Sequence, residues 1–272
     1  MEETLVRLAT QIDEKRYGKY RGIVADNKDP QKRGRLKVFI PSVLADQDSD
    51  WALPCLPYGG AAHQGMFMVP EVDAQVWVEF EEGDIHRPIW VGTFWQQEGD
   101  PPEDAAKEEP TTRLLQTKSG HILQFDDADG EEQFRLHHPA EAEMVIDPNG
   151  TISLTDAQGA TVTLDADAGE ILIEDANGNS MLMSSSGTTV EDANGNKIEM
   201  ASSGITVKGQ EIVVEGSQVL LGGAGGEPVI KGQSFLTLFA THIHTSPFLG
   251  IPTTPPIPQG EMSSLSSTVM SK

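Results

Sequence analysis

The chain has 272 residues, which is enough for one large or two ordinary domains, and only 38% of them are hydrophobic and 6% aromatic. Its formal net charge of −23 opposes binding to nucleic acid phosphates or to an anionic membrane surface, because like charges repel. The single cysteine, Cys55, excludes an intrachain disulfide and a cysteine-based zinc cluster, and its apolar neighbours predict a packed thiol.

The N-terminal region differs in charge from the rest of the chain. Residues 1–40 carry ten Lys or Arg against six Asp or Glu, so the acidity lies downstream. No apolar signal segment opens the sequence, and no run reaches the length of a transmembrane helix, so we expect synthesis in the cytoplasm without a signal peptide. Helical spacing of Leu5, Leu8 and Ile12 predicts a short arm over residues 1–16.

Residues 17–95 have the pattern of a small β-barrel. Short runs with alternating polarity are separated by turn residues, and no helical run lies between them. All four tryptophans and all three tyrosines lie in this segment, which can therefore bury a conventional core. The spacing predicts an OB-type barrel of five or six short strands. They lie at Tyr20–Ala25, Arg35–Ile40, Trp51–Leu56, Ala74–Phe80 and Pro88–Phe94, with Met66–Pro70 leading into Ala74–Phe80 as a candidate sixth.

A linker and a repeat region follow the barrel. Residues 96–112 are rich in Pro, Glu and Asp without an apolar period, which is typical of a linker. Over residues 113–235, short alternating runs are separated by glycines at intervals of eight to ten residues, and the turn tetrad Asp-Ala-Asn/Gln-Gly recurs. Such strand and turn units predict a β-solenoid or β-prism, with strands that include Thr151–Thr155, Thr161–Asp165 and Glu211–Val214.

The composition of the repeats favours several chains around one axis. No aromatic residue occurs between Phe134 and Phe235, so the core must be narrow. Each strand offers two or three small apolar side chains, which bury too little alone to offset the entropy lost on ordering. Residues 141–200 also carry twelve Asp or Glu and a single Lys. We therefore expect identical chains winding round a common axis, with apolar residues inside and acids in water.

The tip region, residues 236–272, contains His242 and His244 immediately before a proline-rich run. In an extended chain, residues i and i+2 project to the same side, so two imidazoles can share one metal ion or one partner. Alone, a His-x-His pair is weak evidence of a metal site. The prolines after it favour a stiff chain without internal hydrogen bonds.

The barrel resembles the OB domain of phage baseplate spike proteins. This family includes baseplate assembly protein V, the central spike of T4-like tails and the VgrG proteins of type VI secretion. The resemblance spans about residues 17–95 and is carried by residues in the same order and spacing, namely Tyr20-x-Gly22-x-Val24, Asp29-Pro30, Gly34-Arg35-Leu36-Lys37-Val38, Pro41, Trp51-Ala52, Pro70-Glu71, Val76-x-Val78-Glu79-Phe80-Glu81-x-Gly83-Asp84 and Pro88-Ile89-Trp90-x-Gly92.

This resemblance implies an all-β homotrimer, in which an OB barrel is followed by an intertwined trimeric β-helix ending in a pointed, metal-binding tip. Short spikes of the family often hold one iron ion per trimer with a His-x-His pair, which maps onto His242 and His244. The implied function is the structural, cell-puncturing spike of a contractile injection system. We expect it in the virion tail baseplate, in contact with a hub protein and the host outer membrane. The muramidase domain of the T4-type spike and the N-terminal hub domain of VgrG have no counterpart in this sequence.

No constellation of residues predicts catalysis, a small-molecule substrate or nucleic acid binding. Residues 81–84 are best explained as an acidic turn, and His63, His86, His137 and His138 as loop residues. The glycines of residues 222–226 lack the Lys and helix of a phosphate-binding loop. We expect the basic residues Lys32, Arg33, Arg35 and Lys37 to dock onto the hub. Two alternatives stay open: an OB-fold nucleic-acid-binding module with an acidic tail, and a monomeric β-solenoid enzyme acting on polysaccharide.

Overall fold

The computed structural model describes residues 15–217, 219 and 232–241, and it divides into two units, residues 1–208 and 209–272. Most of the predicted N-terminal arm therefore lies outside the described residues. The first unit contains two antiparallel-rich sheets, and the longest helix of the described residues belongs to the second unit. The all-β character predicted for the chain is confirmed.

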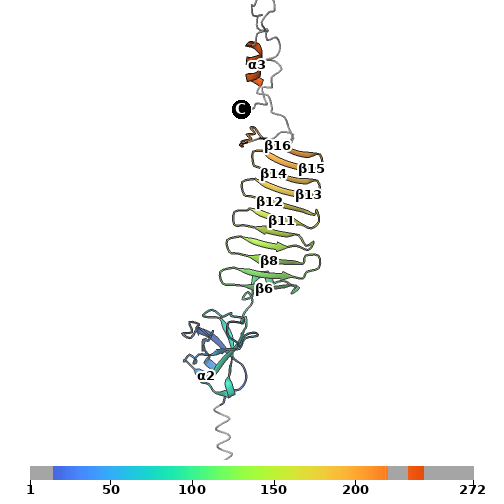
Figure 1. The fold of residues 1–272 in the computed structure, drawn as a ribbon. Helices are drawn as coiled ribbons and strands as arrows, with labels where there is room; N and C mark the ends of the chain where they lie inside the picture. Colours follow the sequence, from blue (N-terminus) through green and yellow to red (C-terminus); the bar gives the residue numbers. More distant parts are fainter. Residues whose placement is uncertain (1–14, 218, 220–231, 242–272) are drawn as a thin grey trace, which may run out of the picture. The chain divides into compact units, whose positions relative to one another are not determined.

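The first sheet has five strands in the order β2-β1-β4-β5-β3. It lies in the blue and teal part of the ribbon around α2 in Figure 1. Isolated pairing of Leu36 with Ala52, through two backbone hydrogen bonds of 3.1 and 2.7 Å, connects the two ends of this order and closes a barrel. Short helical turns α2 and η1 lie between the strands. The bounds are β1 Tyr20–Asp26, β2 Lys37–Phe39, α2 Pro41–Leu44, β3 Leu53–Pro54, β4 Gln75–Phe80, η1 Glu81–Gly83 and β5 Pro88–Thr93.

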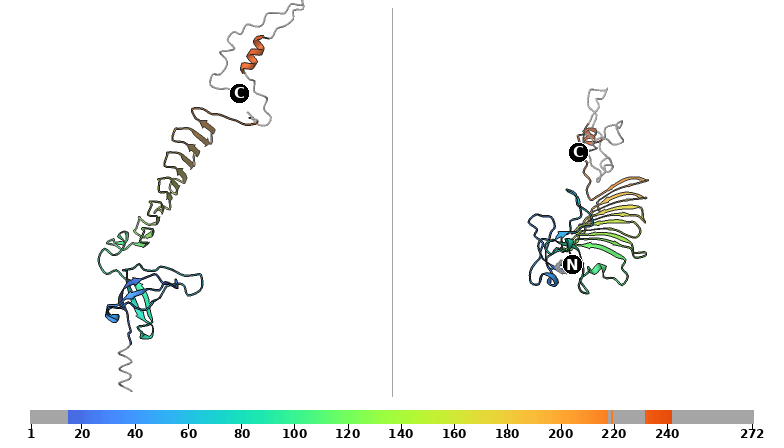
Figure 2. Two further views of the ribbon diagram at one scale, coloured as in Figure 1. Left: turned by 90° about the vertical axis from the view of Figure 1, so that its left-hand side faces the viewer. Right: turned by 90° about the horizontal axis from the view of Figure 1, so that it is seen from below.

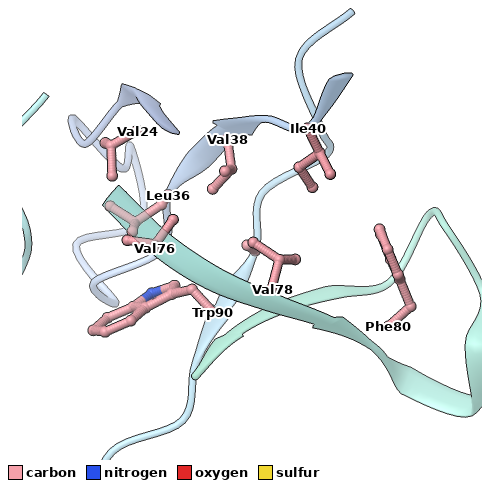
Figure 3. Packing of buried hydrophobic residues seen from close by; sticks show 9 residues of the cluster. Val24, Leu36, Val38, Ile40, Val76, Val78, Phe80 and Trp90 are labelled. Atoms are coloured by element: carbon pink, nitrogen blue, oxygen red, sulfur yellow. The ribbon is translucent and has the colours of Figure 1, made fainter. Parts of the chain in front are cut away.

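The barrel has the only cluster of fully buried hydrophobic residues among the described residues (Figure 3). Strand β4 shows how alternation builds it: Val76, Val78 and Phe80 are buried, while the residues between them are half-buried on the other side of the strand. The cluster also draws on loops and on both neighbouring strands. Its members are Val24, Leu36, Val38, Ile40, Ala52, Val76, Val78, Phe80 and Trp90.

Two glycines of the family pattern permit close contacts in this barrel. A Cβ on Gly22 in β1 would lie 2.3 Å from the Cγ1 atom of Val38, so only glycine allows β1 and β2 to approach this closely. Gly34 has φ of +75°, and its carbonyl oxygen accepts a 3.0 Å hydrogen bond from Trp90 Nε1. The close approach at Gly22 and the left-handed backbone at Gly34 explain why glycine stands at these positions.

The second sheet has eleven strands, β6 to β16, in the order of the sequence, and each strand pairs antiparallel with the next. Figure 2 shows them as successive rungs of a single layer. A short turn, η2 (Glu103–Ala105), precedes it. The strands are β6 Thr112–Gln116, β7 Ile122–Asp126, β8 Gln133–His137, β9 Glu143–Ile146, β10 Ile152–Thr155, β11 Thr161–Asp165, β12 Glu170–Glu174, β13 Ser180–Ser184, β14 Gly187–Glu191, β15 Lys197–Ala201 and β16 Gly204–Lys208.

Several local predictions are corrected. Met66–Pro70 and Glu211–Val214 are not strands, and Phe67, Ile212 and Val214 lie exposed without a neighbouring strand to pair with. Cys55 is exposed rather than packed. A helix that the sequence pattern did not predict, α3 (Gly232–Thr241), crosses the expected boundary between repeat and tip regions. No helix of the described residues is both long and apolar enough to cross a membrane.

Candidate functional site

One face of the eleven-stranded sheet is apolar along nearly its whole length, with Arg113 and Thr188 as the polar exceptions. The pairing register aligns residues of successive strands into columns, and two columns share this face because side chains at i and i+2 of a strand point the same way. The first column is Leu115, Leu123, Leu136, Met144, Leu154, Val162, Ile173, Met181, Val190, Ile198 and Val207. The second is Arg113, Phe125, Phe134, Ile146, Ile152, Leu164, Ile171, Met183, Thr188, Met200 and Ile205.

This apolar face is open to solvent in a single chain. Leu154, Ile173 and Ile198 retain 42%, 40% and 45% of their accessible surface, although they lie in the middle of well-formed strands. Part of the first column forms a groove with a lining that is almost wholly apolar. Monomeric soluble proteins rarely expose a continuous apolar patch of this extent, so such a patch marks an interaction surface.

The opposite face is mostly polar. Its central column is Leu114, Gln124, Arg135, Val145, Ser153, Thr163, Leu172, Leu182, Thr189, Glu199 and Thr206. The column beside it carries charged or hydroxyl side chains at nearly every strand, for example Glu174, Glu191 and Lys197. An antiparallel sheet with one apolar and one polar face is built to bury the first and to keep the second in water.

The predicted linker packs against the start of this polar face. The ammonium of Lys107 forms an ion pair with Asp126, which also accepts a 2.8 Å hydrogen bond from Thr112 Oγ1. Together they hold the pKa of the Asp126 carboxyl well below its ordinary value. Asp104 lies 3.3 Å from Arg135, whose guanidinium also pairs with Glu143. The linker is therefore fixed by charge pairs to strands β7 and β8.

The turns along one edge of the sheet share one geometry. In the Asp-Ala-Asn/Gln-Gly turns the aspartate carboxylate accepts backbone N–H groups two and four residues on, as Asp175 does from Asn177 and Asn179 at 2.9 Å. The fourth residue has positive φ, +89° at Gly159 and Gly178. These carboxylates accept hydrogen bonds from the backbone of their own turns, so they stabilise the turns.

The four predicted docking residues have different surroundings. Arg35 is half-buried and paired with the buried Asp29, with its Nη2 atom 2.6 Å from Oδ1. This guanidinium, with backbone N–H groups, holds the pKa of Asp29 well below its ordinary value. Lys37 is half-buried with its ammonium over Trp51, whereas Lys32 and Arg33 are exposed. Arg35 thus organises the Asp29 loop, and docking by this group remains a prediction.

The predicted metal ligands, His242 and His244, lie outside the described residues. Within the described residues no group of three or more His, Cys, Asp or Glu side chains is arranged to hold a metal ion. His121 and His138 come together from neighbouring turns, with ring centroids 4.8 Å apart, and His86 Nδ1 lies 3.1 Å from Asp50. The sequence predicts an apolar inside for the repeat region. The structure collects these apolar residues in two columns on one face of the long sheet.

Comparison with known protein families gives a match for the barrel. Residues 20–95 match the family described as the type VI secretion system/phage-baseplate injector OB domain. The barrel is similar to injector OB domains. The resemblance noted in the sequence is thereby confirmed, and a spike-like role in an injection apparatus is supported.

Among curated proteins, the chain is similar to the actin cross-linking toxin VgrG1 of Vibrio cholerae serotype O1 (strain ATCC 39541 / Classical Ogawa 395 / O395). The two are 27% identical over 139 residues, which cover 48% of this chain and 13% of VgrG1. The chain therefore spans a small part of that protein.

Among solved structures, the chain is similar to the CPAP G-box domain, at 14% identity over 37% of this chain and 63% of that one, with a TM-score of 0.30. The TCP10 domain of an E1021V mutant of Danio rerio CPAP gives 14% identity over 34% and 51%, with a TM-score of 0.26. Likenesses this weak carry no conclusion about the fold or function of this chain.

Proposed function

We propose that three copies of the chain associate through their apolar sheet faces and form the shaft of a non-enzymatic spike in a contractile injection apparatus. The injector OB domain would seat the spike on the baseplate hub, with Lys32 and Arg33 as its exposed basic contacts. The opposite end would puncture the host outer membrane. The observation that carries the proposal is the pair of columns on one face of β6–β16, which are apolar except at Arg113 and Thr188.

The energetics favour association of this face. Complete burial of an aliphatic side chain contributes about 1.5–3 kcal/mol, so a side chain that is still 40% exposed, such as Ile173, offers on the order of 1 kcal/mol more. Two columns over eleven strands supply enough such positions to exceed the roughly 4–15 kcal/mol that association costs. A three-sided arrangement would bury the apolar faces inside and turn the polar faces outward.

The backbone pairing within each chain leaves contacts between copies to the side chains. Strands β7 to β15 have both neighbours within the same chain, so their N–H and C=O groups need no partner from another copy. Copies would therefore meet mainly through faces and turns. A shaft of this kind has few open sheet edges, which suits a protein that must cross a crowded envelope without aggregating.

We further propose that His242 and His244 hold one transition metal ion, most suitably iron, at the tip. Two imidazoles from each of three chains would give six nitrogen donors, and imidazole suits iron, copper, nickel and zinc. Six donors disfavour zinc, which usually takes four ligands. The ion would tie together three chain ends that otherwise fray.

Chemical cross-linking of the purified chain tests the assembly. Dilute protein treated with an amine-reactive cross-linker should give bands of one, two and three chains on a denaturing gel, with no larger product. A single-chain band alone, at protein concentrations where the chain is folded, contradicts the proposal. Titration with fluorescent oligonucleotides should show no binding, because the chain has a net charge of −23.

A further inference from the structure

The two lateral edges of the long sheet differ in charge. The first edge consists of the turns at residues 117–121, 138–142, 156–160, 175–179 and 192–196. The second edge consists of the turns at residues 127–132, 147–151, 166–169, 185–186 and 202–203. Successive hairpins alternate between the edges, so each turn of the second edge lies at a level between two turns of the first.

Near β6–β9 the two edges have opposite character. The first edge carries Lys118, His121 and His138, all of them exposed, together with one acid, the exposed Glu141. The second edge carries four acids around Gly130, namely Asp127, Asp129, Glu131 and Glu132. The acidic turn connects β7 to β8, and so it lies between the levels of the two histidine-bearing turns.

Near β12–β16 only the first edge carries charge. The first edge is acidic there, with Asp175 and Asp192 in its turns, while the second edge has the uncharged turns Ser184-Ser185-Ser186-Gly187 and Ala201-Ser202-Ser203-Gly204. Around β9–β12 both edges are acidic. In that part Asp147 and Asp156 accept backbone N–H groups of their own turns, which offsets part of their charge.

We propose that the first edge of one copy lies against the second edge of the next copy, with Lys118, His121 and His138 facing Asp129, Glu131 and Glu132. The inference rests on the proposed trimer. In a closed cyclic assembly of identical chains the contact is between two different surfaces, so each first edge must meet a second edge. The charge distribution of the edges fits this pairing and disfavours contact between two second edges.

The contacts within one chain leave this pairing available. Lys118 lies 3.6 Å from Glu71 with 78% of its side chain exposed, and Asp127 already pairs with Arg113 at 2.5 Å. Among the described residues, Asp129, Glu131 and Glu132 have no cationic partner in the same chain. These acids would gain their cationic neighbours from the adjacent copy.

Paired cysteines in a Cys55→Ser background of the full chain test the edge contact. The double variant Ser119→Cys/Asp129→Cys, treated with a short bis-maleimide, should give a covalent species of three chains on a denaturing gel. Each single-cysteine variant should stay a single chain under the same treatment. Covalent dimers from either single variant, or no covalent trimer from the double variant, would overturn the edge pairing.

Light scattering on the same samples separates this inference from the proposed function. A mass of three chains without the covalent trimer refutes the edge pairing and leaves the trimer standing. A mass of one chain refutes both.

A charge exchange gives a second readout. Lys118→Glu should raise the apparent dissociation constant of the assembly by about tenfold. The trimer would have three equivalent edge contacts, and each exposed ion pair contributes a small amount to the free energy of association. Glu131→Lys combined with Lys118→Glu should restore most of that loss, whereas simple addition of the two single effects contradicts the pairing.

Discussion

Val162 and Thr163 are neighbours in β11, yet they belong to opposite faces of the long sheet. Val162 pairs with Leu154 and Ile173 in the first apolar column, and Thr163 pairs with Ser153 and Leu172 on the polar face. Both side chains are half-buried in the single chain. The two positions have the same burial class and differ in the face of the sheet on which they lie. Substitutions at these positions therefore form a matched pair for testing which face associates.

We expect Val162→Asp to prevent association and Thr163→Asp to leave it intact. A carboxylate in the apolar interface would be desolvated without a partner, at a cost of several kcal/mol in each of three chains, whereas on the polar face it stays in water. Sedimentation velocity at several protein concentrations measures the difference. Equal behaviour of the two variants would show that the apolar face is not the interface.

The barrel should be intolerant of Gly22→Ala. The new Cβ would lie 2.3 Å from Val38 Cγ1, and overpacking of this kind typically costs about 1–3 kcal/mol. Adding Val38→Ala removes the obstructing methyl groups, so the double variant should be more stable than the two single effects added together. Urea unfolding followed by tryptophan fluorescence reports on the buried Trp90. An additive double variant would refute the close contact.

Glu141 stands where the other turns of its edge have glycine. Its φ is +65°, compared with +89° for Gly159 in the next turn. Since a left-handed conformation strains any residue with a Cβ by about 1 kcal/mol, Glu141→Gly should stabilise the sheet and Gly159→Glu should destabilise it. Thermal unfolding followed by circular dichroism compares them. Destabilisation by both changes would mean that Glu141 makes a contact that outweighs its backbone strain.

Stability should fall in acid because of Asp29 and Asp126. Each carboxyl has a folded-state pKa well below its ordinary value, caused by Arg35 at Asp29 and by Lys107 at Asp126. A lowered folded pKa adds stability that is complete above about pH 4, the unfolded pKa, and is lost as the pH falls below it. Asp29→Asn should weaken the barrel at pH 7 and flatten this dependence. If Asp29→Asn lost stability with falling pH as steeply as the unchanged protein, the loss would have to come from other groups.

Metal binding should depend on the tip histidines alone. Purified protein should contain about one iron per three chains, and His242→Ala should lose it, whereas His121→Ala should keep it. Elemental analysis with a mass measurement on the same sample checks this. Retention of metal by His242→Ala, or a metal-free wild-type protein, contradicts the tip proposal.

Much of the barrel could be predicted from sequence because local signals agree there. Alternation of Val76, Val78 and Phe80 marked β4, and the order of glycine, proline and tryptophan residues marked the family. Met66–Pro70 misled because its apolar residues suit a strand, but no neighbouring strand is available to pair with it. Strand formation depends on a partner, which local sequence does not specify.

In the long sheet the turns could be predicted from the sequence, whereas the alignment of apolar residues into columns could not be read from any single repeat. Each Asp-Ala-Asn/Gln-Gly tetrad fixes one hairpin, but the continuous apolar columns emerge only when ten hairpins are aligned in one register. Helix α3 was missed because its apolar run is short and lies beside glycine-rich sequence. The linker contacts were missed because the paired residues are far apart in the sequence: Lys107 and Asp126 are 19 residues apart, and Asp104 and Arg135 are 31 apart.

The central claim is that the apolar face is covered by two further copies of the same chain. Multi-angle light scattering of the purified, folded chain measures this directly. We predict a single species of three times 29.4 kDa that persists at low micromolar concentration. A folded species of 29.4 kDa would contradict it.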